Sequence, residues 1–399
     1  MNNWESVRFE NAPLEIIDGD RGVNYPKQSD FMTSGYCLFL NTGNVTEVGF
    51  DFSGCSFINE AKDNKLRKGK LARYDVVLTT RGTVGNLAFY DDRVPFENLR
   101  INSGMVIFRP NKEKLFPRYL YFILKSSIFK EQVSAFTTGS AQPQLPIRDI
   151  NRIEFPLPPL PEQRAIAEIL GALDDKIELN RRMNATLESM ARAVFRQWFV
   201  ENEEVGDWEI VALPEIIEVN PSRSLKKGNV APYLDMANMP MQGHRGIEWI
   251  DRPFGSGTKF INGDTLLARI TPCLENGKTA FVDFLKDGQV GWGSTEYIVL
   301  HPKPPLPPEY GYYLARSEEL RNHAIQNMTG TSGRQRTPAS CFDSFMIVKP
   351  SVELAKKFGE FAKSVIEKVR ANDQESRTLV SLRDSLLPKL MRGEVRVKA

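Results

Sequence analysis

The stretch PLPPLPEQ, Pro156 to Gln163, lies near the middle of a 399-residue chain and leads directly into RAIAEILGALDDKIELNRRMNATLESMARAVFRQWF. This second segment, Arg164 to Phe199, contains no proline and repeats apolar side chains at steps of three and four residues, which predicts one long helix. Proline is favoured in the first turn of a helix, and an acid such as Glu162 stabilises its positive end. Three interpretations compete for the proline run: a ligand for a proline-binding module, a flexible linker, or a rigid joint between a domain and the helix.

A weak repeat runs through the chain with a period of roughly 190 residues. Three pairs of segments match at nearly this offset: YLYFILKSS (119–127) with YGYYLARSE (310–318), TTGSAQPQ (137–144) with MTGTSGRQ (328–335), and YDVVLTTRG (74–82) with GDTLLARIT (263–271). Because the three matches share both their order and their offset, they indicate an internal duplication.

The duplication includes the long helix. The positions that step by three and four in the first copy are Leu170, Leu173, Ile177, Asn180, Asn184, Leu187, Ala191, Val194 and Trp198. The same steps recur between Ala362 and Leu390, so the heptad-like seam predicts two helices that pack together as a coiled coil. Asn180 and Asn372 fall at matching places, and a buried asparagine pair can fix the register of such helices.

Chain order sets the direction of the helix pair. The first helix leads into the second domain and the second helix leaves it, so the two helices are expected to run antiparallel. Each helix of about 40 residues would be roughly 60 Å long. The alternative is two separate amphipathic helices, each covering its own domain, and the duplication disfavours it.

The sequence therefore predicts an α+β protein: two tandem mixed α/β domains separated by two long helices that pair as an antiparallel coiled coil, with a pseudo-two-fold relation between the halves. The expected boundaries are a first domain over 1–155, a central spacer helix over 156–201, a second domain over 202–349 and a C-terminal spacer helix over 350–399. In this register the counterpart of PLPPLPEQ is IVKPSVEL, which keeps only Pro350. A docking ligand should keep its prolines, so the run is interpreted as a rigid joint.

Composition indicates an ordinary globular protein. Hydrophobic residues make up 41% and charged residues 26% of the chain, and the net charge of +2 favours no class of partner. No apolar stretch approaches the roughly 18–20 residues that span a bilayer, and no apolar core follows the initial MNNWESVRFE, so we expect a cytoplasmic protein without a membrane anchor. Four cysteines without CxxC spacing and three histidines predict reduced thiols and no metal site.

No catalytic centre is recognisable in the sequence. Asp51, followed by Glu60 and Lys62, imitates the pattern of a metal-dependent nuclease, but a solvated polar loop is the commoner origin of such a pattern. ENGKTAF (275–281) resembles the end of a phosphate-binding loop, yet Pro272 stands where its first glycine is needed.

Residues suited to bind nucleic acid concentrate on two kinds of loop. VVLTTRGTVGNLAF (76–89) reads as a β-hairpin that presents Thr80, Arg81 and Thr83 at its tip, and its counterpart in the second half carries Arg269 and Thr271. Two polar loops contain the other candidates: Ser140, Gln142, Gln144, Ser332, Arg334, Gln335 and Arg336. Glutamine can read adenine, and arginine guanine, through paired hydrogen bonds. The alternative is that these loops are ordinary protein surface.

Two segments carry a resemblance to a known family. GSAQPQLPIRDINRIEFPLPPLPEQRAIAEILGALDDKIELNRRMN (139–184) resembles the end of a target-recognition domain and the start of the central helix in specificity subunits of type I restriction-modification systems. SLRDSLLPKLMRGEV (381–395) resembles the C-terminal end of these subunits, and the likeness covers the whole chain as domain, helix, domain and helix. The second proline–helix junction departs from the pattern, because residues 352–354 are Val-Glu-Leu where Pro-Glu-Gln would stand.

The resemblance implies a non-catalytic subunit that recognises a two-part double-stranded DNA target, with one half-site per target-recognition domain. It also implies partners: modification subunits that methylate adenine with S-adenosylmethionine, and restriction subunits, endonuclease and translocase, that use ATP and Mg. No cofactor is expected in this chain. From the residues alone two other functions stay open, a duplicated coiled-coil scaffold for protein partners and a nuclease that uses Asp51, Glu60 and Lys62.

Overall fold

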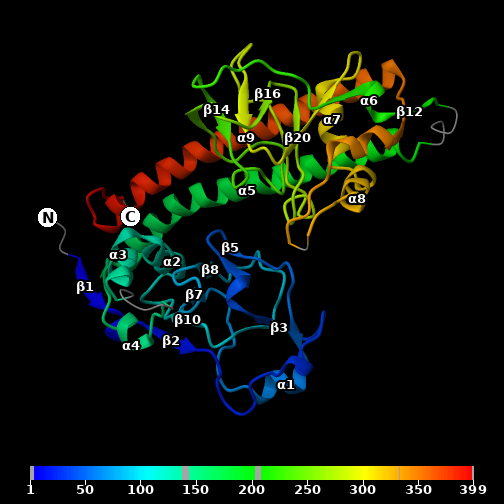
Figure 1. Ribbon diagram of the computed structural model, residues 1–399. Helices are drawn as coiled ribbons and strands as arrows, with labels where there is room; N and C mark the ends of the chain where they lie inside the picture. The colour runs from blue at the N-terminus through cyan, green and yellow to red at the C-terminus, as the bar shows by residue number, and fades with distance from the viewer. Residues whose placement is uncertain (1–3, 137–142, 203–207, 332, 398–399) are drawn as a thin grey trace. The chain divides into compact units, whose positions relative to one another are not determined.

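The computed structural model describes residues 4–136, 143–202, 208–331 and 333–397 (Figure 1). The chain forms two compact units, the first made of residues 1–176 and 378–399 and the second of residues 177–377. The chain passes from one unit to the other at two places, and both places lie inside long helices.

The first unit is built on a four-stranded antiparallel sheet with the strand order β2-β10-β7-β8. The bounds of these strands are Leu14–Asp18, Met105–Pro110, Val76–Thr79 and Leu87–Phe89. β7 is buried on both faces: Val76 and Leu78 face the core that includes α2, whereas Val77 faces the core that includes β3 and β9. This explains its unbroken apolar sequence, since a strand covered on both sides has no polar face.

The remaining elements of the first unit surround this sheet. A second sheet, β6-β3-β9, contains the parallel pair β3 and β9, and β1 pairs with β11. The bounds are β1 Glu5–Arg8, β3 Cys37–Leu40, β4 Val45–Thr46, β5 Gly49–Phe50, β6 Phe57–Ile58, α1 Glu60–Lys65, β9 Leu99–Ile101, α2 Pro117–Lys125, α3 Ser127–Phe136, α4 Ile147–Ile150 and β11 Glu154–Leu157.

The second unit repeats this topology. Its four-stranded antiparallel sheet has the order β13-β20-β17-β18, which corresponds strand for strand to β2-β10-β7-β8. β14 and β19 are parallel, as β3 and β9 are, and β12 pairs with β21 as β1 does with β11. The bounds are β12 Ile210–Ala212, α6 Leu213–Ile216, β13 Ile217–Val219, β14 Val230–Leu234, β15 Ile250–Pro253, β16 Thr258–Phe260, β17 Thr265–Ala268, β18 Thr279–Phe281, β19 Gly291–Gly293, β20 Tyr297–Pro302, α7 Pro308–Ala315, α8 Glu318–Gln326 and β21 Met346–Val348. The structure thus confirms the internal duplication.

A buried aspartate explains one of the sequence matches. Asp75 accepts a hydrogen bond from a backbone amide three residues earlier (2.7 Å) and forms an ion pair with Arg109 on β10 (2.7 Å). Burial raises the pKa of the Asp75 carboxyl, although the Arg109 guanidinium opposes this. Asp264 accepts the equivalent amide bond (2.8 Å) and contacts Nδ1 of His301 on β20 (2.7 Å). In both units the aspartate therefore closes the turn that enters the central strand.

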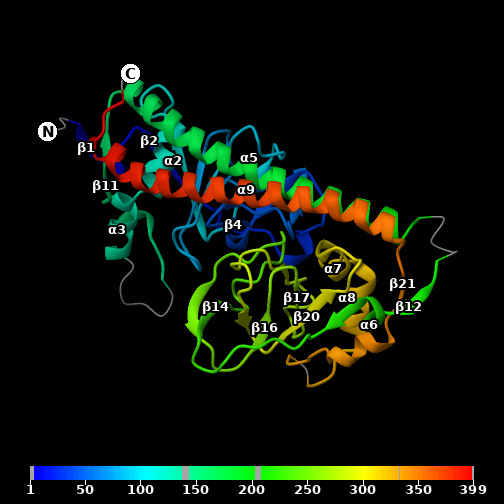
Figure 2. The ribbon, with the colours of Figure 1, turned by 90° about the horizontal axis from the view of Figure 1, so that it is seen from above.

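The two long helices, α5 (Leu160–Phe199) and α9 (Val352–Met391), lie side by side (Figures 1 and 2). Each contains 40 residues, as the sequence predicts. In the second unit Asn180 contacts Asn372, and further along α5 the ring of Phe195 lies 5.4 Å from that of Phe358. The later residue of α5, Phe195, thus contacts the earlier residue of α9, Phe358. This order confirms that the two helices run antiparallel.

The matched asparagines lie in the seam between these helices. Asn180 and Asn372 are both buried. The side-chain amide of Asn180 donates to the backbone oxygen of Asn372 (3.3 Å) and to Glu375 (2.9 Å), and that of Asn372 donates to Asn184 (2.8 Å). Because a buried amide that loses its partner costs free energy, these bonds favour one register of the helix pair.

The start of α5 is bound to the first domain, as expected of a rigid joint. Gln163 is buried, and its amide donates to the backbone oxygens of Lys114 (3.1 Å) and Pro158 (2.8 Å). Its side-chain oxygen accepts from the amide of Phe116 (2.8 Å). At the matching place in the second unit lies Ala355, which is also buried. A polar anchor at one junction is therefore replaced by close apolar packing at the other.

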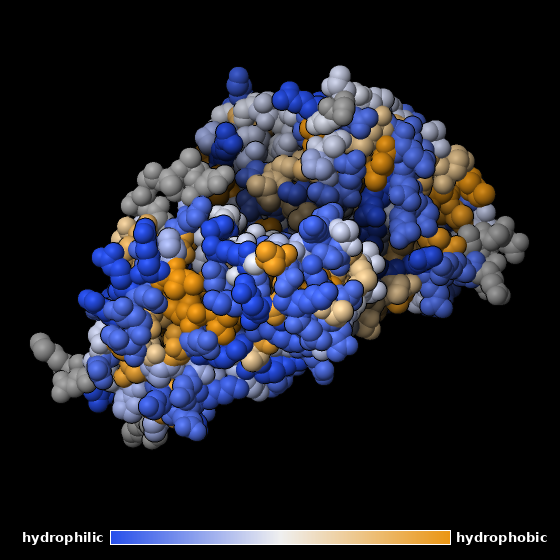
Figure 3. Space-filling model, turned by 90° about the horizontal axis from the view of Figure 1, so that it is seen from below, coloured by the Kyte–Doolittle hydropathy of each residue, from blue (hydrophilic) through white to orange (hydrophobic). Residues whose placement is uncertain are grey.

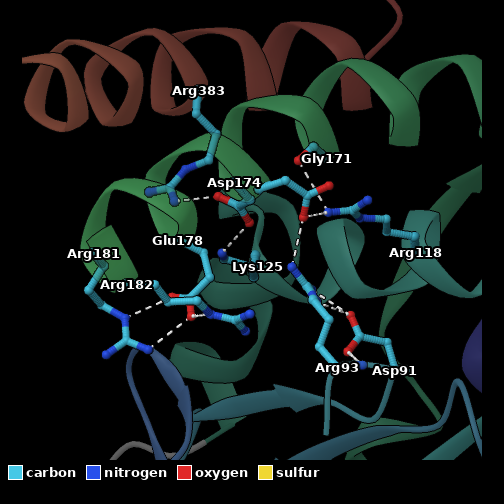
Figure 4. A network of polar contacts seen from close by, with 11 residues as sticks. Asp91, Arg93, Arg118, Lys125, Gly171, Asp174, Glu178, Arg181, Arg182 and Arg383 are labelled. Atoms are coloured by element: carbon cyan, nitrogen blue, oxygen red, sulfur yellow. Dashed lines mark hydrogen bonds and ion pairs between the residues drawn. The ribbon is translucent and has the colours of Figure 1, made fainter. Parts of the chain in front are cut away.

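An aspartate of α5 holds two cations in the first unit (Figure 4). The Asp174 carboxylate lies 3.0 Å from Lys125 of α2 and 2.7 Å from Arg383 of α9. Burial raises the pKa of the Asp174 carboxyl. The two cations lower this pKa by more than burial raises it, so it lies below its usual range. Asp174 thus joins α2, α5 and α9 within one unit.

The neighbouring acids are paired as well (Figure 4). Asp175 forms ion pairs with Arg93 (2.8 Å), from the loop after β8, and with Arg118 of α2. In the second unit Glu178 pairs with Arg181 (2.7 Å), whose hydrogen bonds lower the pKa of Glu178 to about 2. Asp174 and Asp175 therefore hold α5 to the first domain, whereas Glu178 forms its ion pairs within α5 itself.

The face of the molecule seen in Figure 3 is mainly hydrophilic. On the face shown in Figure 3, apolar residues form small groups among hydrophilic ones. No helix in the described part of the chain is long and apolar enough to cross a membrane. Cys37, Cys55, Cys273 and Cys341 are unpaired, as their spacing predicts.

Candidate nucleic-acid interface

Three chain segments meet at the tip of the β7–β8 hairpin in the first unit. The amides of Thr80 and Arg81, directly after β7, donate to the backbone oxygen of Gly104 (2.8 and 3.2 Å), which precedes β10. Arg81 also forms an isolated antiparallel bridge with Gln144. We call Thr80, Arg81, Gly104 and Gln144 the first tip site. Since directly paired residues of antiparallel strands point to the same face, Arg81 and Gln144 present their side chains together.

The side chains of the first tip site divide into exposed and buried ones. Arg81 and Gln144 are exposed, and no described residue pairs with the Arg81 guanidinium. Thr83 is exposed on the same loop. Thr80 is buried, and its hydroxyl donates to the oxygen of Gly104 (3.1 Å). The expectation that Thr80 is presented at the tip is therefore wrong, because this hydroxyl holds the hairpin to the neighbouring strand.

The first tip site borders a surface hollow of about 230 Å³. Its lining includes Arg21, a residue that sequence reasoning missed, together with Arg81 and Gln144. Arg21 is half exposed and contacts Asp18 (3.1 Å) and the backbone oxygen of Ser103 (3.3 Å). Two arginines, a glutamine and the carboxylate of Asp18 thus line one opening, which combines hydrogen-bond donors suited to phosphates or base edges with one acidic acceptor.

Three chain segments meet in the same way in the second unit. The amide of Arg269 donates to the backbone oxygen of Glu296 (3.0 Å), and Ile270 forms an isolated antiparallel bridge with Arg336. We call Arg269, Ile270, Glu296 and Arg336 the second tip site. By strand pairing these four residues occupy the places of Thr80, Arg81, Gly104 and Gln144.

A carboxylate distinguishes the second tip site from the first. Nε of Arg336 donates to both carboxylate oxygens of Glu296 (2.8 and 3.0 Å), and Nε of Arg269 lies 3.7 Å from the same carboxylate. Sequence reasoning missed Glu296, because its match with Gly104 becomes visible only when β20 is aligned with β10. Hydrogen bonds to an acid therefore orient Arg336, with Arg269 close to the same acid, whereas no described acid forms an ion pair with Arg81.

The remaining predicted site residues lie near the second tip site or outside the described residues. Thr271 and Gln335 contact each other through the backbone, with the Thr271 amide donating to the Gln335 oxygen (3.0 Å). Arg334 is exposed. Ser140, Gln142 and Ser332 lie outside the residues that the structure describes.

The residues that imitate a nuclease have other partners. The Asp51 carboxylate accepts the amide of Ser53 (2.8 Å), which lowers its pKa, and Lys62 forms an ion pair with Asp30 (2.9 Å). Across residues 4–136, 143–202, 208–331 and 333–397, no group of three or more histidine, cysteine or acidic side chains is placed to hold a metal ion. Asp51 therefore lies in a surface loop as expected, whereas the expectation of a loop is wrong for Glu60 and Lys62, which belong to the short helix α1.

Comparison with known proteins yields one family. Residues 15–189 match the family model described as a type I restriction modification DNA specificity domain. The chain is 24% identical over 348 residues to the MjaIX type I restriction enzyme specificity subunit of Methanocaldococcus jannaschii, covering 81% of this chain and 78% of that protein. It is 22% identical to the HindI specificity subunit of Haemophilus influenzae, covering 99% and 100% of the two chains.

A solved structure shares the fold. The S subunit of the type I restriction-modification system from M. genitalium matches with a TM-score of 0.60 and 16% identity, over 98% of this chain and 97% of that one. The likeness therefore extends over both units and both long helices.

Proposed function

The chain belongs to the family of type I restriction-modification specificity subunits, and on this premise we propose that it reads a two-part DNA target, with one half-site at each tip site. One observation carries the proposal: in each unit three chain segments meet at a tip site with the same backbone pairing, but their side chains differ between the two units. The same backbone bridge pairs the exposed Arg81 with the exposed Gln144 in one unit, and the half-buried Ile270 with the half-buried Arg336 in the other. One scaffold with two sets of side chains is suited to read two different short sequences.

The proposal assigns chemistry to partner subunits. This chain supplies hydrogen-bond donors and acceptors, and it acts as a non-catalytic subunit in the cytoplasm. Modification subunits bind to it and methylate adenines with S-adenosylmethionine, and restriction subunits use ATP and Mg to translocate and cut DNA. Phosphate contacts of this chain add affinity for any sequence, whereas the tip sites supply the preference for one.

Exchanging the second domain tests the proposal directly. Residues 202–348 are replaced by those of another specificity subunit, and the complex with the modification subunits is assayed by sequencing methylated adenines. Only one half of the methylated motif should change, because the first tip site keeps all its residues. A change in both halves, or in neither, would show that the halves are not read independently. Binding that does not weaken as salt is raised would instead favour a protein scaffold.

Arg81→Ala tests the first tip site. Loss of a base contact should cost about 1–3 kcal/mol of binding free energy and relax one position of the first half-site. Loss of a phosphate contact should instead weaken binding to all sequences alike. It should also reduce the slope of log affinity against log salt concentration by about one. The matched control is Arg8→Ala, which removes an exposed arginine from β1. Unchanged affinity at both low and high salt would remove Arg81 from the interface.

A further inference from the structure

The second tip site contains an arginine whose donors are divided between a carboxylate and solvent. Arginine has five N–H donors in a planar fork. At Arg336 the Nε donor is taken by Glu296 (2.8 and 3.0 Å), and the side chain is still 43% exposed. No described residue accepts a hydrogen bond from its two terminal nitrogens. The free end of the fork therefore presents two parallel donors in a fixed direction.

The carboxylate beside this fork gives its donors a direction. The Glu296 carboxylate is 22% exposed and also lies 3.7 Å from Arg269, so the three side chains together keep a positive charge. Glu296 weakens the attraction of Arg336 for phosphate without cancelling that of the cluster, and it leaves the directional donors intact. A neutral base edge with two adjacent acceptors fits this arrangement better than an anion does. In the major groove only guanine presents two acceptors, O6 and N7, and arginine binds them in pairs.

The first tip site shows the contrast that the proposal requires. Gly104 stands at the place of Glu296, and Gln144 stands at the place of Arg336. Asp18 lines the hollow beside Arg81 but pairs with Arg21 (3.1 Å), so no described carboxylate fixes the direction of the Arg81 guanidinium. Glutamine at the Arg336 place has the donor and acceptor pair that suits adenine. The two units therefore differ in chemistry at one shared position.

Building on the proposed function, we propose that Arg336 reads a guanine in the second half-site and that Glu296 is the positioning residue that directs it to the base. Glu296 fixes the guanidinium plane through Nε, and the two terminal nitrogens donate to O6 and N7 of the guanine. Arg269 contributes a second cation, whose Nε lies 3.7 Å from the same carboxylate.

Conservative substitutions test the role of Arg336 in the complete complex with modification subunits. Arg336→Lys keeps the charge but removes the planar fork, so a phosphate contact would largely survive it and a paired base contact would not. We expect the preference for guanine over other bases at one position of the second half-site to fall by roughly tenfold or more. The measurements are sequencing of methylated adenines and affinities for duplexes with each base at that position.

Glu296→Gln tests the positioning residue separately. It removes the negative charge at nearly constant size, so we expect a smaller loss of preference at the same position together with a steeper dependence of binding on salt. A merely structural role for Glu296 would change neither the preferred base nor the salt dependence. The control Lys349→Gln removes an exposed charge from an ion pair with Glu209 at the β12–β21 end of the unit and should change nothing.

The outcomes separate this inference from the proposed function. Reading of the first half-site in the same complex shows that each variant is folded and assembled. If the unmodified complex reads no two-part target, both the proposed function and the inference are overturned. A different result would overturn the inference alone. In that case the unmodified complex reads a two-part target, while Arg336→Lys changes no base preference in the second half-site or weakens binding to all sequences alike.

Discussion

Four residues inserted into each long helix, after Lys176 in α5 and after Arg377 in α9, should abolish methylation of the native target and shift it to a target with a longer unread gap. These are the two places where the chain passes between the units, so the insertions leave each unit with its own residues. Four helical residues add about 6 Å, slightly more than one turn. DNA rises about 3.4 Å per base pair, so the gap should grow by roughly one or two base pairs.

The half-sites themselves should stay the same, because neither tip site is altered. Sequencing of methylated adenines in the complex with modification subunits measures both the half-sites and the gap. The matched control inserts the same four residues at Gly288, an exposed glycine in a turn of the second unit, and should leave the gap unchanged. Two results would refute the idea that the length of the helices sets the gap between the half-sites. One is a gap that the insertions leave unchanged, and the other is methylation of several gap lengths both before and after them.

Phe358→Ala should destabilise the second unit by about 3–5 kcal/mol, the usual cost of removing a fully buried aromatic ring. Phe358 of α9 is fully buried. Its ring lies 5.4 Å from that of Phe195, 5.3 Å from Phe199 and 5.5 Å from Tyr313, so it joins both helices to α7. Denaturant unfolding, followed by the near-ultraviolet signal of the aromatic residues, measures the loss.

A neighbouring ring supplies the control for this prediction. Phe361 lies one turn further along α9 and is only partly buried, so Phe361→Ala should cost clearly less. Equal effects of the two substitutions would show that the cluster around Phe358 does not hold the second domain to the helices. In the assembled complex, Phe358→Ala should impair reading of the second half-site more than that of the first.

The sequence by itself determined the features that depend on near neighbours in the chain. The two helices follow from apolar side chains at steps of three and four, and Asn180 and Asn372 stand out because they interrupt that pattern at matching places. The β7–β8 hairpin follows from two apolar runs around Arg81-Gly82. The duplication follows from repeated segments, since both copies must build the same strands.

Which side chains face outward was decided only by the tertiary structure. Thr80 and Arg81 are adjacent and equally polar in the sequence, yet the first is buried against Gly104 and the second is exposed. The difference arises because alternate residues of a strand point to opposite faces. Thr80 is also bonded to Gly104, the residue before the neighbouring strand β10, and no local pattern in the sequence predicts that neighbour.

The carboxylate of the second tip site shows the same limit most clearly. Glu296 lies 40 residues before Arg336 in the chain, and nothing near it in the sequence marks it as a partner. The two meet because β20 pairs with β17, which places Glu296 beside Arg269, while the segment after α8 returns to bridge the end of β17. Hydrogen bonds and ion pairs depend on a few ångströms in space. Strand order therefore decides which charges meet, after the local patterns have decided which strands exist.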